Sequence, residues 1–593
     1  MVCGAHNAFT AEQSNLMRTQ TDAKVRSDIV LVTKKLTVRT VVFPYPLVRP
    51  LIEPPSNSNS PSMKGKNCSK KSAIAIGTLS GVLLLMAIAL IAIYGSFDKL
   101  VARMIHSNIA ITQSSTVYSQ WVSPDTPIFF SIYLFNITNQ KDIEKGEKPR
   151  VQQIGPYVYI EKRIKTNITW PKGDTSRVSF YQRLVFTLDR NLSVGDPDKD
   201  TVIGISTPFV TIAANMEAGN GPSWTQYSFM TMFIEPKLFI KTSVTKFLWG
   251  YVDPVTDACN AFDSKKCPTP KVGLMLGKNG TDAGPFVIDT GVNDITKVGN
   301  ILTFQGKDTL DVWSSDKANQ IIGTDGSQFA PDLTMDSRRF IFAADLCRSF
   351  EMRVDGIGKL TNSDKIKVFS LAGTPETAQS ATMNSDNLGY CPPKTPGPKC
   401  PPAGIFDLSS CRRQGDLRPP VYSSQPYFLG ADPALREGVD GLYVPSKANA
   451  STKVFVEPKL GLVLEAYKRL QISIYVRPSK EMPDQFKNWT EPVFLPMVWF
   501  EEKAVAGADA LQILYESLYV KPEKGRFLLL IVIGVVLGLL VIFMITLVAI
   551  LLNIRRGHSW TQMIVQLDFK VLEAQFHLAH NNLLSRLPLL ASN

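Results

Sequence analysis

Cysteine is the reactive residue that this 593-residue chain concentrates most clearly in one stretch. Two of its eight cysteines, Cys3 and Cys68, precede a long apolar segment, and the other six fall within residues 259–411. An even number of cysteines in an oxidising compartment is typical of disulfides, with buried free thiols as the alternative. These six are Cys259, Cys267, Cys347, Cys391, Cys400 and Cys411.

Asparagine supplies a second chemistry, as the acceptor of N-linked glycans in Asn-x-Ser/Thr triplets. Six triplets lie between two long apolar segments, and a seventh begins at Asn67, before the first segment. If the intervening region leaves the cytosol, the six are predicted glycosylation sites and Asn67 is not. The six begin at Asn136, Asn167, Asn191, Asn279, Asn449 and Asn488.

The region between the apolar segments is poor in residues for hydrolytic catalysis. Its one histidine is His106, and it contains no Gly-x-Ser-x-Gly or His-Glu-x-x-His motif. Hydrolase chemistry usually needs a nucleophile beside a base, so we predict no enzyme, no cofactor and no metal site. The adjacent carboxylates of Glu501 and Glu502 are interpreted as a solvated surface turn.

Two uncharged segments, Ser72–Tyr94 and Phe527–Leu552, are each long enough to cross a bilayer as a helix. About seventy residues precede the first, too many for a signal peptide. The lysines just before it, and Arg555 and Arg556 after the second, predict that both termini are cytosolic. The expected order is a tail (1–71), a helix (72–94), an outer domain (95–526), a helix (527–552) and a tail (553–593).

The formal charge of +12 is concentrated outside the outer domain. Residues 1–71 alone hold 11 Lys and Arg against 4 Asp and Glu. This pattern favours contact with anionic lipid at the membrane and gives no support to nucleic-acid binding. Residues 44–62 are rich in Pro, Ser and Asn, which is typical of disorder. Cys68 is a candidate for palmitoylation, with an unmodified thiol as the alternative.

Alternating apolar residues predict short strands through most of the outer domain, which we interpret as one α+β domain. Residues 203–248 differ, because Ala, Ile and other apolar residues recur there at helical spacing, and we predict two or more helices with a turn at Gly219–Pro222. The predicted strands are Ile128–Phe135, Tyr157–Lys162, Arg177–Leu188, Ile301–Phe304, Arg339–Leu346, Ile366–Leu371, Leu460–Ala466 and Ile472–Val476.

Six sequence stretches, taken together and in order, resemble the class B scavenger receptors. They are GPYVYIEKR (155–163), FLWGYVDP (247–254), ADLCRSF (344–350), GIFDLSSC (404–411), GLVLEAYKRLQISIYVRPS (461–479) and FLPMVWFEE (494–502). The resemblance covers about four-fifths of the chain and implies an antiparallel β-barrel core, an apical helical bundle at 203–248 and an apolar tunnel. It also implies two disulfides, Cys347–Cys411 and Cys391–Cys400.

The chain departs from the family at two points. The family's third disulfide would fall near Ser315 and Gly389, where both cysteines are missing, and we expect Cys259 and Cys267 to form a disulfide of this chain's own. The basic pair that some members carry on the apical bundle falls at Phe233 and Glu235. Candidate capture residues are therefore Met230, Phe233, Lys237 and Lys241, with packing inside the bundle as the alternative for the apolar ones.

The resemblance implies a receptor that captures lipids, fatty acids or lipoproteins at its apex and passes lipid through the tunnel to the membrane. The alternative is a receptor for a protein ligand at the apical bundle, as one lysosomal member of the family is. The plasma membrane is the expected location, with the lysosomal or endosomal membrane as the alternative. A two-helix channel is disfavoured, because the apolar segment at 527–552 offers few polar residues to line a pore.

Overall fold

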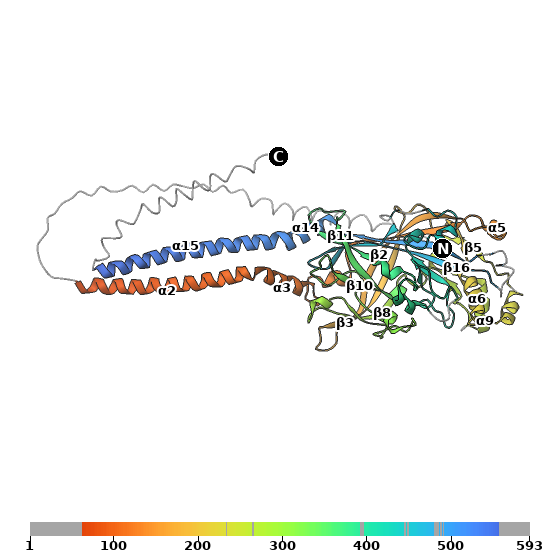
Figure 1. Ribbon diagram of the computed structural model, residues 1–593, viewed down its shortest axis with the longest axis horizontal. Helices are drawn as coiled ribbons and strands as arrows, with labels where there is room; N and C mark the ends of the chain where they lie inside the picture. Colours follow the sequence, from red (N-terminus) through yellow and green to blue (C-terminus); the bar gives the residue numbers. More distant parts are fainter. Residues whose placement is uncertain are drawn as a thin grey trace, which may run out of the picture. The chain divides into compact units, whose positions relative to one another are not determined.

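A computed structural model describes the chain over residues 62–556, except residues 233, 264–265, 392–395, 444–445, 447–449, 480–485, 487–488 and 490. The two predicted membrane spans are confirmed as helices α2 (Ser62–Gly95) and α15 (Lys521–Arg556), each long and apolar enough to cross a bilayer. They run side by side (Figure 1), and Leu83 and Ala87 of α2 are buried against Val536 of α15. Most of their other apolar side chains are exposed, as in helices that face lipid.

The region between the two long helices is built around one antiparallel sheet of thirteen strands, which confirms the predicted fold class. Its main path runs β10-β11-β12-β15-β16-β17-β1-β2-β3-β8-β9, and off this path β14 pairs with β16 and β13 pairs with β14. These strands are β1 (Ile128–Ile137), β2 (Val151–Thr169), β3 (Arg177–Asp189), β8 (Asp282–Asp289), β9 (Ile301–Phe304), β10 (Arg338–Ala343), β11 (Arg348–Gly358), β12 (Val368–Gly373), β13 (Phe406–Asp407), β14 (Val421–Ser424), β15 (Lys453–Glu457), β16 (Leu462–Val476) and β17 (Val493–Val505).

The sheet nearly closes into a barrel, because residues 323 and 324 connect its two end strands. The amide of Ile301 in β9 donates to the carbonyl of Gly323, and the amide of Thr324 donates to Phe340 in β10. Gly323 has a φ of +98°, and a Cβ there would lie 2.1 Å from the carbonyl oxygen of Phe340. Glycine is therefore required where the barrel closes.

One predicted division within the sheet is wrong. Except for its first two residues, Leu460–Ala466 belongs with Ile472–Val476 to the single strand β16 (Leu462–Val476), which pairs with β17 from Glu465 to Val476. The intervening Lys468 and Arg469 interrupt the apolar alternation in the sequence. Both are paired with acidic residues of β17, so the strand continues through them.

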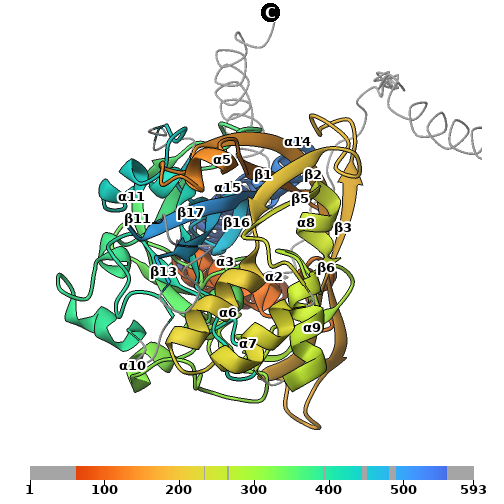
Figure 2. The same ribbon diagram turned by 90° about the vertical axis from the view of Figure 1, so that its right-hand side faces the viewer.

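Helices cover the end of the barrel away from α2 and α15 (Figures 1 and 2), and we call the group of α6, α7 and α9 the apex. The predicted helical bundle at 203–248 is only partly helical, because β4 and β5 pair as a ribbon at its two ends. Pro236 follows α7 and is incompatible with a helix continuing to Leu248. The elements are β4 (Thr201–Ile205), α6 (Thr207–Glu217), α7 (Trp224–Thr231), β5 (Phe239–Ser243), α8 (Val244–Trp249), β6 (Tyr251–Val252), α9 (Pro254–Asp263) and β7 (Lys271–Val272).

The remaining helices are short or connect the barrel to the membrane spans. Helix α3 follows α2 directly, and α14 leads into α15. Arg526 of α15 donates to Asp98 of α3 at 3.0 Å, which ties the two connections together. These helices are α3 (Phe97–Ile109), α4 (Tyr118–Val122), α5 (Gln140–Ile143), α10 (Asp316–Asn319), α11 (Ala434–Glu437) and α14 (Ala508–Tyr515).

Candidate functional site

The barrel contains a partly open cavity of about 1470 Å³. Thr207 and Pro208, at the start of α6, line it near the apex, and Ile111, just after α3, lines it near the membrane spans. Between them the wall is largely apolar, with Phe130 and Phe186 in contact at 5.2 Å between ring centroids. The sequence predicted a tunnel here, and the structure has a partly open cavity whose lining includes residues near both ends of the barrel.

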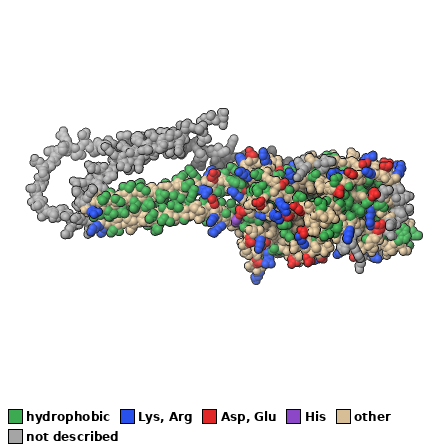
Figure 3. Space-filling model, in the orientation of Figure 1, with side chains coloured by type: hydrophobic (Ala, Val, Ile, Leu, Met, Phe, Trp, Pro, Cys, Tyr) green, Lys and Arg blue, Asp and Glu red, His purple; other side chains and the backbone are tan. Residues whose placement is uncertain are grey.

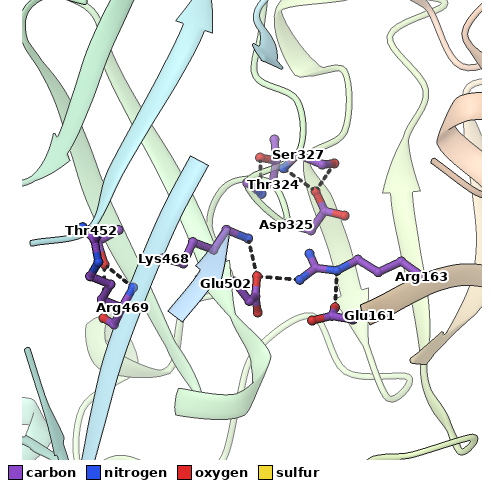
Figure 4. Close-up of polar contacts among 10 residues, drawn as sticks. Glu161, Arg163, Thr324, Asp325, Ser327, Thr452, Lys468, Arg469 and Glu502 are labelled. Carbon is purple, nitrogen blue, oxygen red and sulfur yellow. Dashed lines mark hydrogen bonds and ion pairs between the residues drawn. The ribbon is translucent and has the colours of Figure 1, made fainter. Parts of the chain in front are cut away.

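Part of this wall is charged, which the sequence did not predict. We call Glu161, Arg163, Lys468 and Glu502 the charged belt; Figure 4 shows how they meet. In the sheet register Lys468 lies opposite Glu502, and Glu502 lies opposite Phe130. Residues opposite each other in antiparallel strands point to the same face. The belt therefore shares the inner face of the barrel with the aromatic wall.

Arg163 is the centre of the belt. Its Nε donates to Glu161 Oε1 at 2.6 Å, and its Nη2 donates to Glu502 Oε2, also at 2.6 Å. The Lys468 Nζ lies 3.7 Å from the same Glu502 oxygen. Glu161 is almost fully buried beneath them, whereas the side chains of Arg163, Lys468 and Glu502 keep 24%, 31% and 27% of their surface exposed toward the cavity.

A second pair of charges lies beside the belt. Asp325 faces the cavity above Arg163 (Figure 4) and accepts from Ser327 at 2.5 Å. Lys165 donates to the carbonyl oxygen of Trp121 at 2.9 Å, with its Nζ 5.0 Å from the centroid of that ring. Burial lowers the pKa of Lys165, which Asp325 partly offsets. Burial opposes ionisation of Asp325, but Lys165 and Ser327 outweigh it and hold its pKa below the ordinary range.

The two acids of the belt differ in their ease of protonation. Burial raises the pKa of Glu161 above its ordinary value, although Arg163 favours the ionised form. Burial acts in the same direction on Glu502, but Arg163 and Lys468 outweigh it and hold the pKa of Glu502 below its ordinary value. Glu161 is therefore the carboxylate of the belt that accepts a proton more readily.

The interpretation of Glu501 and Glu502 as a solvated turn is wrong. Both belong to β17, where Glu501 accepts from Arg469 at 2.6 Å on one face and Glu502 joins the belt on the other. The signal in the sequence was the strand spacing of Glu161, Arg163 and Lys165, which alternation places on one face of β2. It was hidden because a charged strand face normally indicates solvent.

The predicted capture residues differ in how exposed their side chains are. Met230 is only 3% exposed and packs in the core of the apex, whereas Lys237 and Lys241 are exposed. Phe233 lies outside the described residues. Exposed apolar side chains occupy α7 and its end: Trp224, Phe229 and Met232. Met232 belongs to the apolar stretch from which the sequence suggested capture residues, whereas Trp224 and Phe229 were not singled out. Hydrophobic side chains are visible at the tip of this end of the molecule (Figure 3).

Three disulfides join the six cysteines between the two long helices: Cys259–Cys267, Cys347–Cys411 and Cys391–Cys400. Cys259 is fully buried in α9, so the first disulfide links this helix of the apex to the segment that follows it. Ser315 and Gly389, where the family's other bridge was expected, lie in contact: a Cβ on Gly389 would stand 3.1 Å from the Ser315 Cβ.

The predicted glycan acceptors lie in different surroundings. Asn167 and Asn191 are exposed. Asn136 is half-buried in β1 and accepts from the amide of Ile203, and the exposed Asn279 bonds the backbone of Phe186 through both side-chain atoms. Asn449 and Asn488 lie outside the described residues, as do residues 1–61 and 557–593. Cys68 lies in α2.

Comparison with known proteins agrees with this architecture. The sequence pattern of the CD36 family matches residues 79–547. Lysosome membrane protein 2 of Homo sapiens is 32% identical over 413 residues, covering 68% of this chain and 80% of that protein. Scavenger receptor class B member 1 is 28% identical over 463 residues in Cricetulus griseus, covering 78% of this chain and 86% of that protein. Barrel, membrane spans and sequence together place the chain in the CD36 family, the class B scavenger receptors.

Proposed function

We propose that this protein is a receptor that captures lipid or lipoprotein particles at its apex and passes lipid through the barrel to the membrane. The observation that carries the proposal is the cavity, whose lining extends from the start of α6 to Ile111 beside the membrane-proximal helix α3. Exposing a hydrocarbon chain to water costs about 0.8 kcal/mol per CH2 group. A largely apolar path inside the barrel lowers that cost during transfer.

The apex supports the capture step. Trp224, Phe229 and Met232 are 53%, 47% and 75% exposed, and Lys237, five residues after Met232 in the sequence, is also exposed. Large apolar side chains exposed together are typical of interaction surfaces. Protein capture without lipid transport is the second candidate, favoured by the identity to lysosome membrane protein 2 and by the same exposed surface.

The arrangement in the membrane is part of the proposal. Residues 95–526 would face the outside or a lumen, with glycans at the predicted asparagines, and the tails at 1–71 and 553–593 would be cytosolic. Cys68 would then be available for palmitoylation. The plasma membrane is the proposed location, with the lysosomal membrane as the alternative, and the protein acts by binding and transport and not as an enzyme.

The test is to narrow the cavity and measure transfer. Gly373 lines the cavity, and no heavy atom beyond its chain neighbours lies within 4 Å of the position of a Cβ there, so Gly373→Trp places an indole in the path. We expect the initial rate of transfer of a fluorescent lipid from emulsion particles to vesicles carrying the full chain to fall severalfold.

The matched control is Gly507→Trp, at the N-cap of α14. Gly507 has the same open space around its Cβ position and a φ of −66°, but it does not line the cavity. Transfer by this variant should equal that of the original chain. Unchanged transfer by Gly373→Trp, with particle binding intact, would favour the protein-capture alternative.

A further inference from the structure

Arg348, at the start of β11, is a buried cation that forms no ion pair with a described residue. It is 6% exposed, and its Nη2 donates to the carbonyl oxygen of Thr377 at 2.9 Å and to Asn387 Oδ1 at 3.0 Å. Both acceptors are neutral. Its buried Nε donates to no acceptor in the part of the chain that the structure describes. Because buried charges are normally paired, we expect an anion to compensate this guanidinium.

The acids near Arg348 are occupied elsewhere. Five acids lie within three residues of Arg348 or of a residue that it contacts, and four of them are paired with other cations. The fifth, Asp407, follows Phe406 in β13 and points to the opposite face of that strand, since side chains alternate along a strand. The undescribed residues 392–395 are Pro, Pro, Lys and Thr and add no acid. The four pairings are Asp345 with Lys278 and Arg412, Glu351 with Arg338 and Arg353, Glu376 with Arg353, and Asp386 with Lys317.

Three aromatic rings contact the guanidinium but do not replace a counter-ion. Its central carbon lies 3.6 Å from the ring centroid of Tyr390, 5.0 Å from that of Phe406 and 5.7 Å from that of Phe350. Cation–π contacts recover less free energy than a fully buried charge loses with its hydration. Burial lowers the pKa of Arg348 to about 10, with Tyr390 acting in the opposite direction, so the side chain is still charged at neutral pH.

Arg348 borders the cavity. In the sheet register it lies opposite Ala343, and residues opposite each other in antiparallel strands point to the same face. Ala343, Phe350, Thr377 and Phe406 all line the cavity. Since the cavity is partly open, it offers a path from solvent to the guanidinium.

We propose that Arg348 binds a small monovalent anion, of the size of chloride, where its guanidinium borders the cavity. One negative charge balances the one positive charge, whereas a divalent anion would leave an excess in a buried position. A water molecule can accept a hydrogen bond from Nε but supplies no charge. The rings of Tyr390, Phe406 and Phe350 crowd the guanidinium, which favours a monatomic ion over a larger organic anion.

The ion would stabilise a corner at which separate chain segments meet. The contacts of Arg348 come from β11 itself, from β13 and from the residues after β12 that include Thr377, Asn387 and Tyr390. An anion that binds the folded chain and not the unfolded chain raises stability as its concentration increases. Chloride should therefore stabilise the protein through Arg348, independently of lipid transport.

The experiment measures thermal unfolding of the purified full chain in a nonionic detergent by tryptophan fluorescence. Chloride is raised from about 1 to about 300 mM, with sodium gluconate keeping the ionic strength constant. We expect the unfolding midpoint of the original chain to rise by about 2 °C. The excess linewidth of the ³⁵Cl NMR signal, which bromide should displace, reports bound chloride directly on the same samples.

Two variants should remove this dependence for different reasons. Arg348→Met removes the cation. Asn387→Asp keeps the cation and places a carboxylate at the atom that accepts from its Nη2, so the counter-charge becomes part of the chain. The absolute stability of this variant is not the readout, because Asn387 also donates to the carbonyl oxygens of Glu376 and Gln379.

The matched control is Arg353→Met. Arg353 lies on the same strand as Arg348, but it is paired with Glu351 and Glu376. Its loss leaves the proposed anion site in place, so this variant should keep the full rise of the unfolding midpoint with chloride.

The contrary outcomes are distinct. No rise in the original chain, or an equal rise in the original chain and in Arg348→Met, would overturn the site, since an equal rise is a general salt effect. If Arg348→Met did not fold, a full rise or an unchanged ³⁵Cl linewidth in Asn387→Asp would overturn it as well. Sulfate that stabilised the original chain as much as chloride, with the effect lost in Arg348→Met, would contradict a small monovalent ion.

Discussion

At the apex, Trp224, Phe229 and Met232 hold large apolar side chains in water, whereas on the cavity wall Arg163 and Glu502 hold charges inside the protein. Each region reverses the usual distribution of apolar and charged residues. The apolar surface outside is suited to meeting a lipid or protein partner, and the charges inside are suited to a polar group that arrives with the partner. The contrast shows that the cavity of this barrel is not only apolar, because its wall also carries charges.

The largest expected effect comes from removing the centre of the belt. Arg163→Met leaves Glu161 and Glu502 close together without their shared cation, and we expect a loss of about 3–5 kcal/mol in the free energy of unfolding. Thermal unfolding of the detergent-solubilised chain, followed by tryptophan fluorescence, measures it.

A companion variant separates the cost of a broken pair from the value of the belt. Replacing all four members with Leu or Met of similar size should restore stability to within about 1 kcal/mol of the original chain, because no unpaired charge remains. If the fourfold variant were as unstable as Arg163→Met, the belt would be a structural element, and the contrast with the apex would lose its functional meaning.

A second test uses Asp407, a buried carboxylate that contacts no cation among the described residues. Asp407 is 4% exposed; its Oδ1 accepts from the amide of Ser409, and its Oδ2 has no partner among the described residues. Burial raises its pKa to about 6. Because the unfolded chain releases this proton first, stability falls as the pH rises from about 4 to about 6, by about 3 kcal/mol in total.

Asp407→Asn keeps the Oδ1 acceptor and removes the charge. We expect the variant to unfold at a higher temperature than the original chain at pH 7.5, with the advantage shrinking as the pH is lowered toward 4.5. An advantage independent of pH would mean that Asp407 has the same pKa in the folded and unfolded chain, and burial would then not raise it. Comparing the change in stability of this variant with that of Arg163→Met then shows how much the ion pairs of the belt contribute to stability.

The sequence predicted the parts of the molecule that follow from local pattern. The membrane spans need only an uncharged run, and strands such as Arg177–Leu188 need only alternation, so both are found. The belt depends on the register of β16 with β17 and on β1, which pairs with both β17 and β2. It brings Arg163 of β2 to Glu502 of β17, 339 residues further along the chain. No local pattern distinguishes a charge facing a cavity from a charge facing solvent, which is why Glu502 was placed on the surface.

The apex shows the same limit of sequence-based prediction, here for apolar residues. Met230 and Met232 are two residues apart in an apolar stretch, and only the packing of α7 makes one 3% and the other 75% exposed. The sequence also predicted that a helix continues past Pro236 into what is strand β5. This error arose because the pairing of β5 with β4 cannot be predicted from the sequence of either strand alone.

These two methionines give the smallest expected effect on stability and the sharpest test of the apex. Met230→Ala should lower the free energy of unfolding by about 2 kcal/mol, since it empties space in the core, whereas Met232→Ala should change it by less than about 0.5 kcal/mol. Binding of lipid emulsion particles to vesicles carrying the full chain should follow the opposite order, with the larger loss in Met232→Ala once folded protein is equalised. Equal binding by both variants would indicate that the apolar surface of α7 takes no part in capture. The exposed apolar side chains of the apex would then reflect only how the apex packs, and the comparison with the cavity wall would carry no functional meaning.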